Sequence, residues 1–189
     1  LLCLSLMLAI AVRGNQVTPS QTLAQQPNPQ ANHQPVFVHL FEWKWDDIAQ
    51  ECETFLSPKG YGAVQISPPA EHIVLPEQSF PWWQRYQPVS YKLVSRSGDQ
   101  TQLVRMIDRC HQVGIRIYAD AVINHMAAIA RGVGSAGTPY SRYHYPGLYQ
   151  PQDFHTCRKS ISNYNNREEV NQCELVGLPD LNTTSPQVR

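Results

Sequence analysis

The first half of the chain alternates between short apolar runs and segments in which apolar residues recur at helical spacing. The runs over 36–41, 62–67 and 115–119 have the length of strands buried in a sheet. Between them, apolar residues repeat every three or four positions over 45–56 and 99–113, which predicts two helices. Strand, helix, strand, helix, strand is typical of βαβ units, so we expect an α/β fold with a parallel sheet.

The third apolar run, which follows Gly114, has the character of a strand covered on both faces. Asp120, Asn124 and His125 come at its carboxyl end. Ligands bind at that end of the strands in α/β sheets and barrels. Because Asp and Asn also serve turns, the position alone leaves a structural role open.

The pattern changes after Ala127, where Gly, Ser, Pro, Tyr and Asn dominate to about Gly177 without a helical period. A loop this long inside a compact domain is usually functional or forms a small irregular subdomain. The segment 178–182 closes this excursion. Three strands are too few to close a barrel, so we expect a structural unit that these 189 residues leave unfinished.

Two segments at the start of the chain do not belong to this pattern. Residues 1–14 resemble the apolar part of a secretory signal peptide and are too short to span a bilayer. Residues 15–35 are rich in Gln, Pro and Asn, which indicates a disordered leader. We therefore expect a secreted, extracellular protein. The formal net charge is zero and no basic block is present, so nucleic-acid and membrane partners are not expected.

Cys3 lies in the signal segment, which leaves four cysteines: Cys52, Cys110, Cys157 and Cys173. An even number in a secreted protein predicts two disulfides, with three possible connectivities. A zinc site is the alternative, but the chain has no CxxC or HExxH spacing. Cys52 and Cys110 each lie on a predicted helix, and neighbouring helices on one side of a sheet could bring them together.

Five stretches carry a resemblance to a known family: VHLFEW (38–43), QISPP (65–69), PWWQRYQP (81–88), DAVINHM (120–126) and LPDL (178–181). In this order they resemble the animal-type α-amylases of the α-amylase glycoside hydrolase family. The resemblance implies the N-terminal part of a (β/α)₈ TIM barrel, about three β/α units, with an irregular domain B inserted after strand 3. The barrel part would cover 36–125, domain B 126–178 and the return toward the barrel 179–189.

The resemblance also implies a Ca²⁺ site that joins the two ends of domain B. Asn124 would bind through its side-chain oxygen and Asp180 through its carboxylate. Asn171 falls where the family uses an arginine's backbone carbonyl, which tolerates a change of side chain. These are the hard oxygen ligands that calcium prefers. A chloride site, used by many animal-type members, would lie beyond residue 189.

Substrate-binding roles follow from the same motifs. His125 matches a histidine that donates to a sugar hydroxyl at the cleavage subsite, and Tyr86 matches a tyrosine that stacks under the same sugar. Trp82 and Trp83 match an aromatic platform for neighbouring glucose units, and Tyr164 matches a domain B tyrosine facing the cleft. Core packing is the alternative role for any single Trp or Tyr.

The remaining matches concern support and cross-links. Asp120 matches an aspartate near the cleavage subsite that holds neighbouring groups in place and is not the nucleophile. The pairs Cys52–Cys110 and Cys157–Cys173 match two family disulfides. A third family bridge uses a cysteine where this chain has Val94.

The implied function is that of a secreted, monomeric, endo-acting α-amylase that hydrolyses internal α-1,4-glucosidic bonds of starch and glycogen by a retaining double displacement. Retaining glycosidases need two carboxylates about 5 Å apart. In the family these follow strands four and five, beyond residue 189. We therefore expect no catalytic carboxylate in these residues and no activity of the fragment alone. The alternative is an inactive amylase-like protein that only binds glucan.

Overall fold

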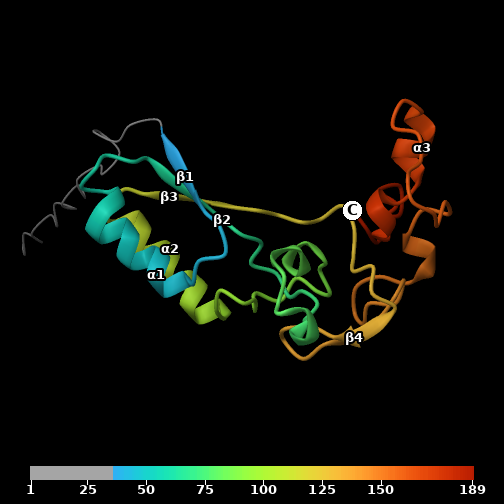
Figure 1. Ribbon diagram of the computed structural model, residues 1–189, viewed down its shortest axis with the longest axis horizontal. Helices are drawn as coiled ribbons and strands as arrows, with labels where there is room; N and C mark the ends of the chain where they lie inside the picture. The colour runs from blue at the N-terminus through green and yellow to red at the C-terminus, as the bar shows by residue number, and fades with distance from the viewer. Residues whose placement is uncertain (1–35) are drawn as a thin grey trace, which may run out of the picture.

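A computed structural model describes residues 36–189 (Figure 1). The signal peptide expected over 1–14 and the leader expected over 15–35 lie outside the described residues. Within 36–189, no helix is long and apolar enough to cross a membrane.

The first part of the chain folds as a small parallel sheet with helices on one face. The strands β1 (Phe37–Leu40), β2 (Ala63–Ile66) and β3 (Arg116–Ala119) are parallel and lie in that order. The connecting helices α1 (Trp45–Glu51) and α2 (Gln100–Gln112) lie side by side below the sheet in Figure 1. The predicted α/β fold with a parallel sheet is confirmed.

Both helices lie where apolar spacing placed them, with local differences. The segment expected to be helical over 45–56 ends in a π-helical turn, η2 (Cys52–Leu56). A capping box starts α2: the Asp99 carboxylate accepts from the Gln102 N–H at 2.8 Å, and the Gln102 side chain accepts from the Asp99 N–H at 3.1 Å. The Cys52–Cys110 disulfide joins the two helical segments, as the resemblance implied.

A first hydrophobic core fills the space between the helices and the sheet. Its buried members are Leu40, Trp45, Ile48, Ala49, Cys52, Leu56, Val64, Ile66, Leu103, Met106, Cys110 and Ile115. The opposite face of the sheet is open: Phe37 is 53% and Tyr118 is 46% exposed, and their rings meet edge to face at 5.8 Å.

The expectation that the third strand is covered on both faces is therefore wrong for the described residues. Three of the four residues of β3 are exposed. The physical reason is that α1 and α2 cover only one face of the sheet, and β3 is its edge strand.

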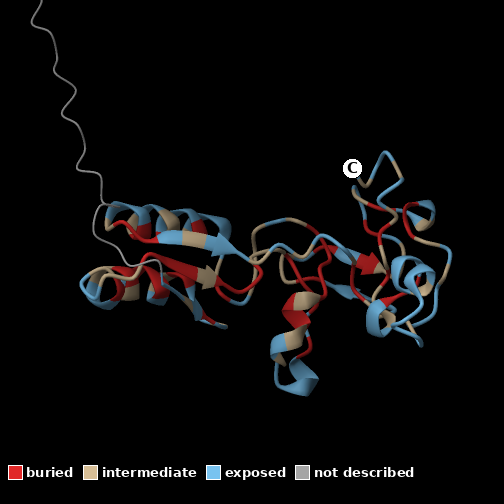
Figure 2. Cartoon of the chain, turned by 90° about the horizontal axis from the view of Figure 1, so that it is seen from above, coloured by how far each residue is buried: buried red, intermediate tan, exposed pale blue. Residues whose placement is uncertain are grey.

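After β3 the chain enters a second lobe, at the right of Figure 1 and shown by burial in Figure 2. It holds the antiparallel pair β4 (Arg131–Val133) and β5 (Pro139–Ser141), then η5 (Pro151–Asp153), α3 (Arg167–Gln172) and η6 (Leu175–Gly177). The sequence pattern gave no helix here, so α3 is a correction.

The start of α3 is set by its cap and not by apolar spacing. The Asn166 side chain accepts from the N–H groups of Glu168 and Glu169. Six residues are too few to show a helical period, which is why the pattern missed this helix. The Cys157–Cys173 disulfide, also implied by the resemblance, closes the segment that contains α3.

A second core holds this lobe together, and the loop after β2 contributes to it. Its buried members are Ile73, Leu75, Val89, Met126, Ala127, Tyr140, Tyr145, Tyr149, Phe154 and Leu181. The loop carries two short 3₁₀ turns, η3 (Pro76–Gln78) and η4 (Trp82–Tyr86). The aromatic motif of η4 is thereby fixed between the sheet and the second lobe.

Candidate functional site

Polar and aromatic side chains meet beyond the carboxyl ends of the parallel strands. Asp120 follows β3 directly, and η4 supplies Tyr86. The Tyr86 hydroxyl donates to the Asp120 Oδ2 at 2.9 Å. The His125 Nε2 lies 2.9 Å from the Tyr86 carbonyl oxygen. Three residues that the resemblance assigned to the cleavage subsite therefore lie in one cluster.

The environment keeps Tyr86 in its neutral, donating form. Burial, together with the hydrogen bond to the Asp120 carboxylate, raises the pKa of Tyr86 to about 12. At any physiological pH the Tyr86 hydroxyl therefore stays protonated and donates a hydrogen bond to the Asp120 carboxylate. This bond fixes the ring of Tyr86 relative to the end of β3.

Trp82 extends this cluster into an exposed aromatic wall. Its side chain is 55% exposed, and its ring meets Tyr86 at 5.8 Å and Phe41 at 5.7 Å between centroids. Exposed aromatic rings suit flat, amphipathic ligands such as sugars. Trp83 lies apart from this wall, because it is partly buried against the second core.

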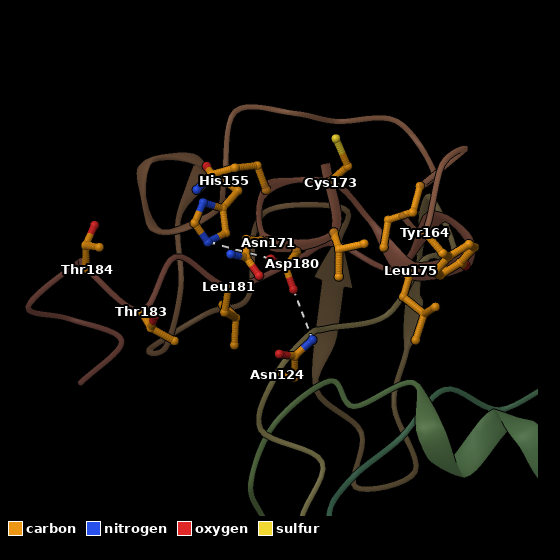
Figure 3. A pocket seen from close by; sticks show the side chains of 13 residues that line it. Asn124, His155, Tyr164, Asn171, Cys173, Leu175, Asp180, Leu181, Thr183 and Thr184 are labelled. Carbon is orange, nitrogen blue, oxygen red and sulfur yellow. Dashed lines mark hydrogen bonds and ion pairs between the residues drawn. The ribbon is translucent and has the colours of Figure 1, made fainter. Parts of the chain in front are cut away.

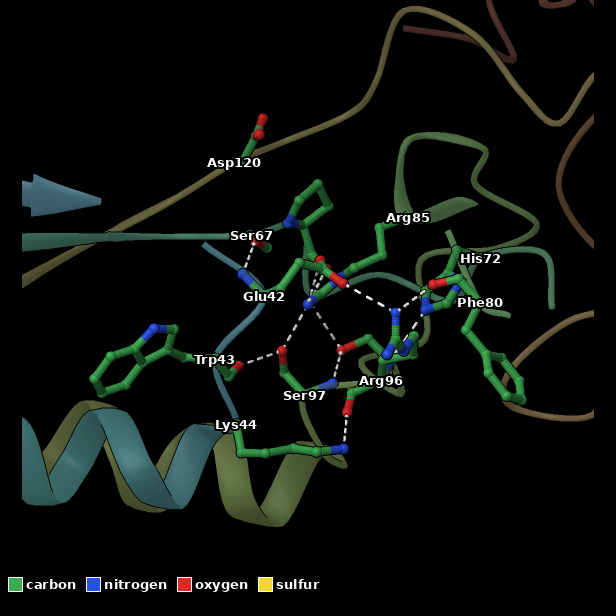
Figure 4. Close-up of polar contacts among 12 residues, drawn as sticks. Glu42, Trp43, Lys44, Ser67, His72, Phe80, Arg85, Arg96, Ser97 and Asp120 are labelled. Atoms are coloured by element: carbon green, nitrogen blue, oxygen red, sulfur yellow. Dashed lines mark hydrogen bonds and ion pairs between the residues drawn. The ribbon is translucent and has the colours of Figure 1, made fainter. Parts of the chain in front are cut away.

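A buried arginine anchors η4 to the ends of the strands (Figure 4). Arg85 donates to the Glu42 Oε1 at 3.1 Å, to the Pro68 carbonyl at 2.7 Å and to the Ser97 Oγ at 2.6 Å. Its guanidinium also lies 5.6 Å from the centre of the Trp45 ring. Arg96 donates to the other Glu42 oxygen at 3.2 Å. Glu42 thus binds two arginines, one buried and one exposed.

The sequence analysis missed this anchor. Arg85 and Glu42 both lie within motifs that carried the resemblance, but nothing in their spacing indicated that they pair across 43 residues. Phe41 was also missed as part of the aromatic wall. Its position at the end of the apolar run 36–41, inside the motif of residues 38–43, was the available signal.

The two ends of the second lobe meet beside this cluster (Figure 3). The Asn124 side-chain amide donates to the Asp180 Oδ1 at 3.0 Å. His125 and Asp180 form an isolated antiparallel bridge. Asn124, Asn171 and Asp180 all line one cavity of about 490 Å³, and Tyr164 lies at its edge. The structure therefore brings the three residues assigned to calcium around one space.

The charges in this cavity bear on whether a cation would fit. Burial raises the pKa of Asp180 despite the opposing charge of His155, whose Nε2 lies 3.6 Å from the Asp180 Oδ2. Within residues 36–189, no group of three or more His, Cys, Asp or Glu side chains could hold a metal ion. A metal here would need amide and carbonyl oxygens beside the Asp180 carboxylate, and this hard donor set fits calcium.

Comparison with known proteins places the chain in a family. No family model matches the chain, so the assignment rests on individual relatives. An α-amylase from Thermomonospora curvata is 53% identical over 174 residues, which is 89% of this chain and 29% of that protein. An α-amylase from Tribolium castaneum is 55% identical over 80% of this chain and 31% of its own length. The chain belongs to the α-amylase family. It spans about a third of the length of these curated relatives.

Solved structures agree with this assignment. The chain matches the α-amylase I of Eisenia fetida with a TM-score of 0.77, at 46% identity over 80% of this chain and 32% of that one. A mutant of the same enzyme in complex with maltohexaose gives a TM-score of 0.78. An α-amylase from Malbranchea cinnamomea, at 20% identity and a TM-score of 0.61, shows likeness of fold alone.

Proposed function

We propose that this chain is part of a secreted, endo-acting α-amylase that hydrolyses internal α-1,4-glucosidic bonds of starch and glycogen with retention. The observation that carries the proposal is the cluster of Trp82, Tyr86, Asp120 and His125 beyond the strand ends. It occurs in a chain more than 50% identical to two α-amylases.

Within this proposal the residues of the chain bind and orient glucan. The faces of glucose rings carry C–H groups that pack on Trp82 and Tyr86, while His125 donates to a sugar hydroxyl. Asp120 holds the Tyr86 hydroxyl and does not attack the sugar. The nucleophile and the general acid/base come from outside these residues, so the 189-residue chain alone has no hydrolytic activity.

We also propose that Asn124, Asp180 and the backbone carbonyl of Asn171 hold Ca²⁺. What supports this is that all three line one cavity and that Asp180 is a partly buried carboxylate facing it. Calcium would contribute charge neutralisation and would link the two ends of the second lobe. Two disulfides are consistent with secretion, because such bonds persist in oxidising compartments.

The proposal is tested by measuring starch hydrolysis with the full-length protein that contains this chain. We expect the viscosity of amylose to fall before many reducing ends appear, as internal cleavage requires. Trp82→Ala and Tyr86→Ala should each lower kcat/KM, either through a raised KM or through a lowered kcat. Phe55→Ala, which changes a comparably exposed aromatic on η2, is the control and should leave both unchanged.

The same experiment separates the alternative function. Binding of maltohexaose without hydrolysis by the full-length protein would identify an inactive glucan-binding relative. Neither binding nor hydrolysis would contradict both functions.

A further inference from the structure

The chain segments that enter and leave the second lobe run antiparallel and pair with each other. The Leu181 N–H donates to the Asn124 carbonyl at 3.0 Å, and the Met126 N–H donates to the Pro179 carbonyl at 3.0 Å. From the first pair to the second, the entering segment advances by two residues, from 124 to 126, and the leaving segment goes back by two, from 181 to 179. This is the register of an antiparallel ladder. We call these segments, residues 124–128 and 177–181, the neck.

The next pair in this register is Ala128 with Gly177, and a side chain joins it. No backbone hydrogen bond within residues 36–189 links these two residues directly. Instead, Arg142 donates from Nη1 to the Ala128 carbonyl at 2.7 Å and from Nη2 to the Gly177 carbonyl at 2.8 Å. The guanidinium therefore occupies the place of the third pair.

A buried carboxylate fixes that guanidinium in place. The Glu174 Oε2 accepts from the Arg142 Nη2 at 2.6 Å, and the Glu174 Oε1 accepts from the Tyr143 hydroxyl at 2.5 Å. The Glu174 side chain is only 3% exposed. Charge-assisted bonds of this kind are short and directional, so the arginine fork has little freedom to turn.

We propose that Arg142 is a positioning residue that closes the neck and so holds Asn124 against Asp180 before any metal binds. The planar guanidinium reaches the two carbonyls and the carboxylate from two nitrogens in a rigid fork, whereas a lysine ammonium carries its three donors on one nitrogen at the end of a flexible stem. The consequence for calcium affinity rests on the calcium site proposed above, while the closure of the neck does not.

The chain offers a matched control. Arg158 also lies over the Tyr143 ring, at 4.2 Å from its centre against 5.2 Å for Arg142. Its hydrogen bond goes to the Pro151 carbonyl and not to the neck. Arg158→Ala therefore removes a positive charge and an aromatic contact from the same ring, and leaves the neck untouched.

The first readout is amide hydrogen exchange of the metal-free, full-length protein, followed by mass spectrometry in peptides that cover the neck. In Arg142→Ala we expect the Met126 and Leu181 amides to exchange at least about tenfold faster than in the wild type. Arg142→Lys should show an intermediate rate. Arg158→Ala should exchange at the wild-type rate.

The second readout is the dissociation constant for Ca²⁺, measured by calorimetric titration of the same proteins. Arg142→Ala should bind calcium about tenfold more weakly, because the unclosed neck must be ordered on binding. Arg158→Ala should bind within twofold of the wild type. Retained exchange rates and calcium affinity in Arg142→Ala would overturn the proposal.

Two further outcomes are decided by the same set of proteins. If Arg142→Ala does not fold, Arg142→Lys takes its place, and wild-type exchange in that variant would overturn the proposal. If the wild type binds no calcium, the proposed metal site is wrong, and the exchange comparison alone decides whether Arg142 closes the neck.

Discussion

At the scale of single residues, Glu71 shows how the loop after β2 is joined to the second lobe. Its buried carboxylate accepts from the Ser90 hydroxyl at 2.5 Å and from the N–H groups of Ala136 and Thr138, each at 3.0 Å. Burial raises the pKa of Glu71, but these hydrogen bonds outweigh that effect and hold it below its usual value. The carboxylate is therefore charged and fully occupied at neutral pH.

Gly134 lies against this carboxylate, which makes it a sensitive position. A Cβ at residue 134 would lie 2.4 Å from the Glu71 Oε1. We expect Gly134→Ala to lower the free energy of unfolding by about 2 kcal/mol, because the carboxylate cannot move without losing its donors. Urea denaturation measures this. The control is Gly147→Ala, where a Cβ meets nothing within 4 Å and only the positive φ costs about 1 kcal/mol. If both variants lost the same unfolding free energy, the predicted clash between a Cβ at residue 134 and Glu71 would be contradicted.

His72 should make stability depend on pH. Burial lowers its pKa from 6.5 to about 4, with the hydrogen bond to the Ile73 carbonyl opposing and the charges of Arg85 and Arg96 adding to the shift. The folded protein keeps His72 neutral where the unfolded chain protonates it. The contribution of neutral, buried His72 to the free energy of unfolding is therefore complete above pH 6.5. As the pH falls toward 4, the free energy of unfolding decreases by up to about 3 kcal/mol.

Urea denaturation at pH 7 and pH 4.5 tests this dependence. The wild type should lose more unfolding free energy between the two pH values than His72→Gln, whose side chain does not titrate. The same loss in both proteins would show that other groups cause the pH dependence.

At the scale of elements, the position of η4 depends on one buried ion pair. The four donor contacts of Arg85 reach the ends of β1 and β2 and the turn before α2. Tyr86 is its direct neighbour in sequence, so the anchor sets where the aromatic wall stands. The short turn has no side-chain cap of its own.

We expect Arg85→Ala to destabilise the protein by about 3 kcal/mol, because it removes the buried partner of Glu42 and the donor that the Pro68 carbonyl and the Ser97 Oγ accept from. Arg96→Ala is the matched control. It removes the other arginine of Glu42, but its side chain is 42% exposed, so the loss should be below about 1 kcal/mol. Unfolding in urea, followed by tryptophan fluorescence, distinguishes the two. A larger loss in Arg96→Ala would contradict the assignment of the anchor.

The elements predicted from sequence were those with a strong apolar period. The strands were predicted from short apolar runs, and the two connecting helices from burial on one side, as the spacing of Ile48, Cys52 and Leu56 illustrates. The short capped helix α3 and the aromatic 3₁₀ turn η4 carry no such apolar period. Their conformation depends on hydrogen bonds from Asn166 and Arg85, which a pattern of apolar residues does not contain.

At the scale of the whole molecule, the described residues form two separate cores. One lies between the sheet and its helices, and the other lies inside the second lobe and the loop after β2. The motifs identified Tyr86, Asp120 and His125, and the structure brings these three residues into one cluster. The motifs could not locate Arg142 or Glu42, because those side chains act through contacts between segments far apart in sequence.

The open face of the sheet is consistent with a larger parent fold. Phe37 and Tyr118 contact each other there and stay about half exposed, and large apolar side chains are rarely left this exposed in a finished core. In the proposed barrel this face would be the interior. In the proposed enzyme the described residues would supply one wall of the substrate cleft, and its catalytic carboxylates would come from outside residues 36–189.

The most direct test of the account is the anomeric configuration of the first products. The full-length protein is given maltohexaose, and the new reducing ends are observed by proton NMR before mutarotation. We predict α-anomeric products, as a retaining double displacement requires. Products of the β configuration, or bound maltohexaose that is never cleaved, would contradict the proposed function.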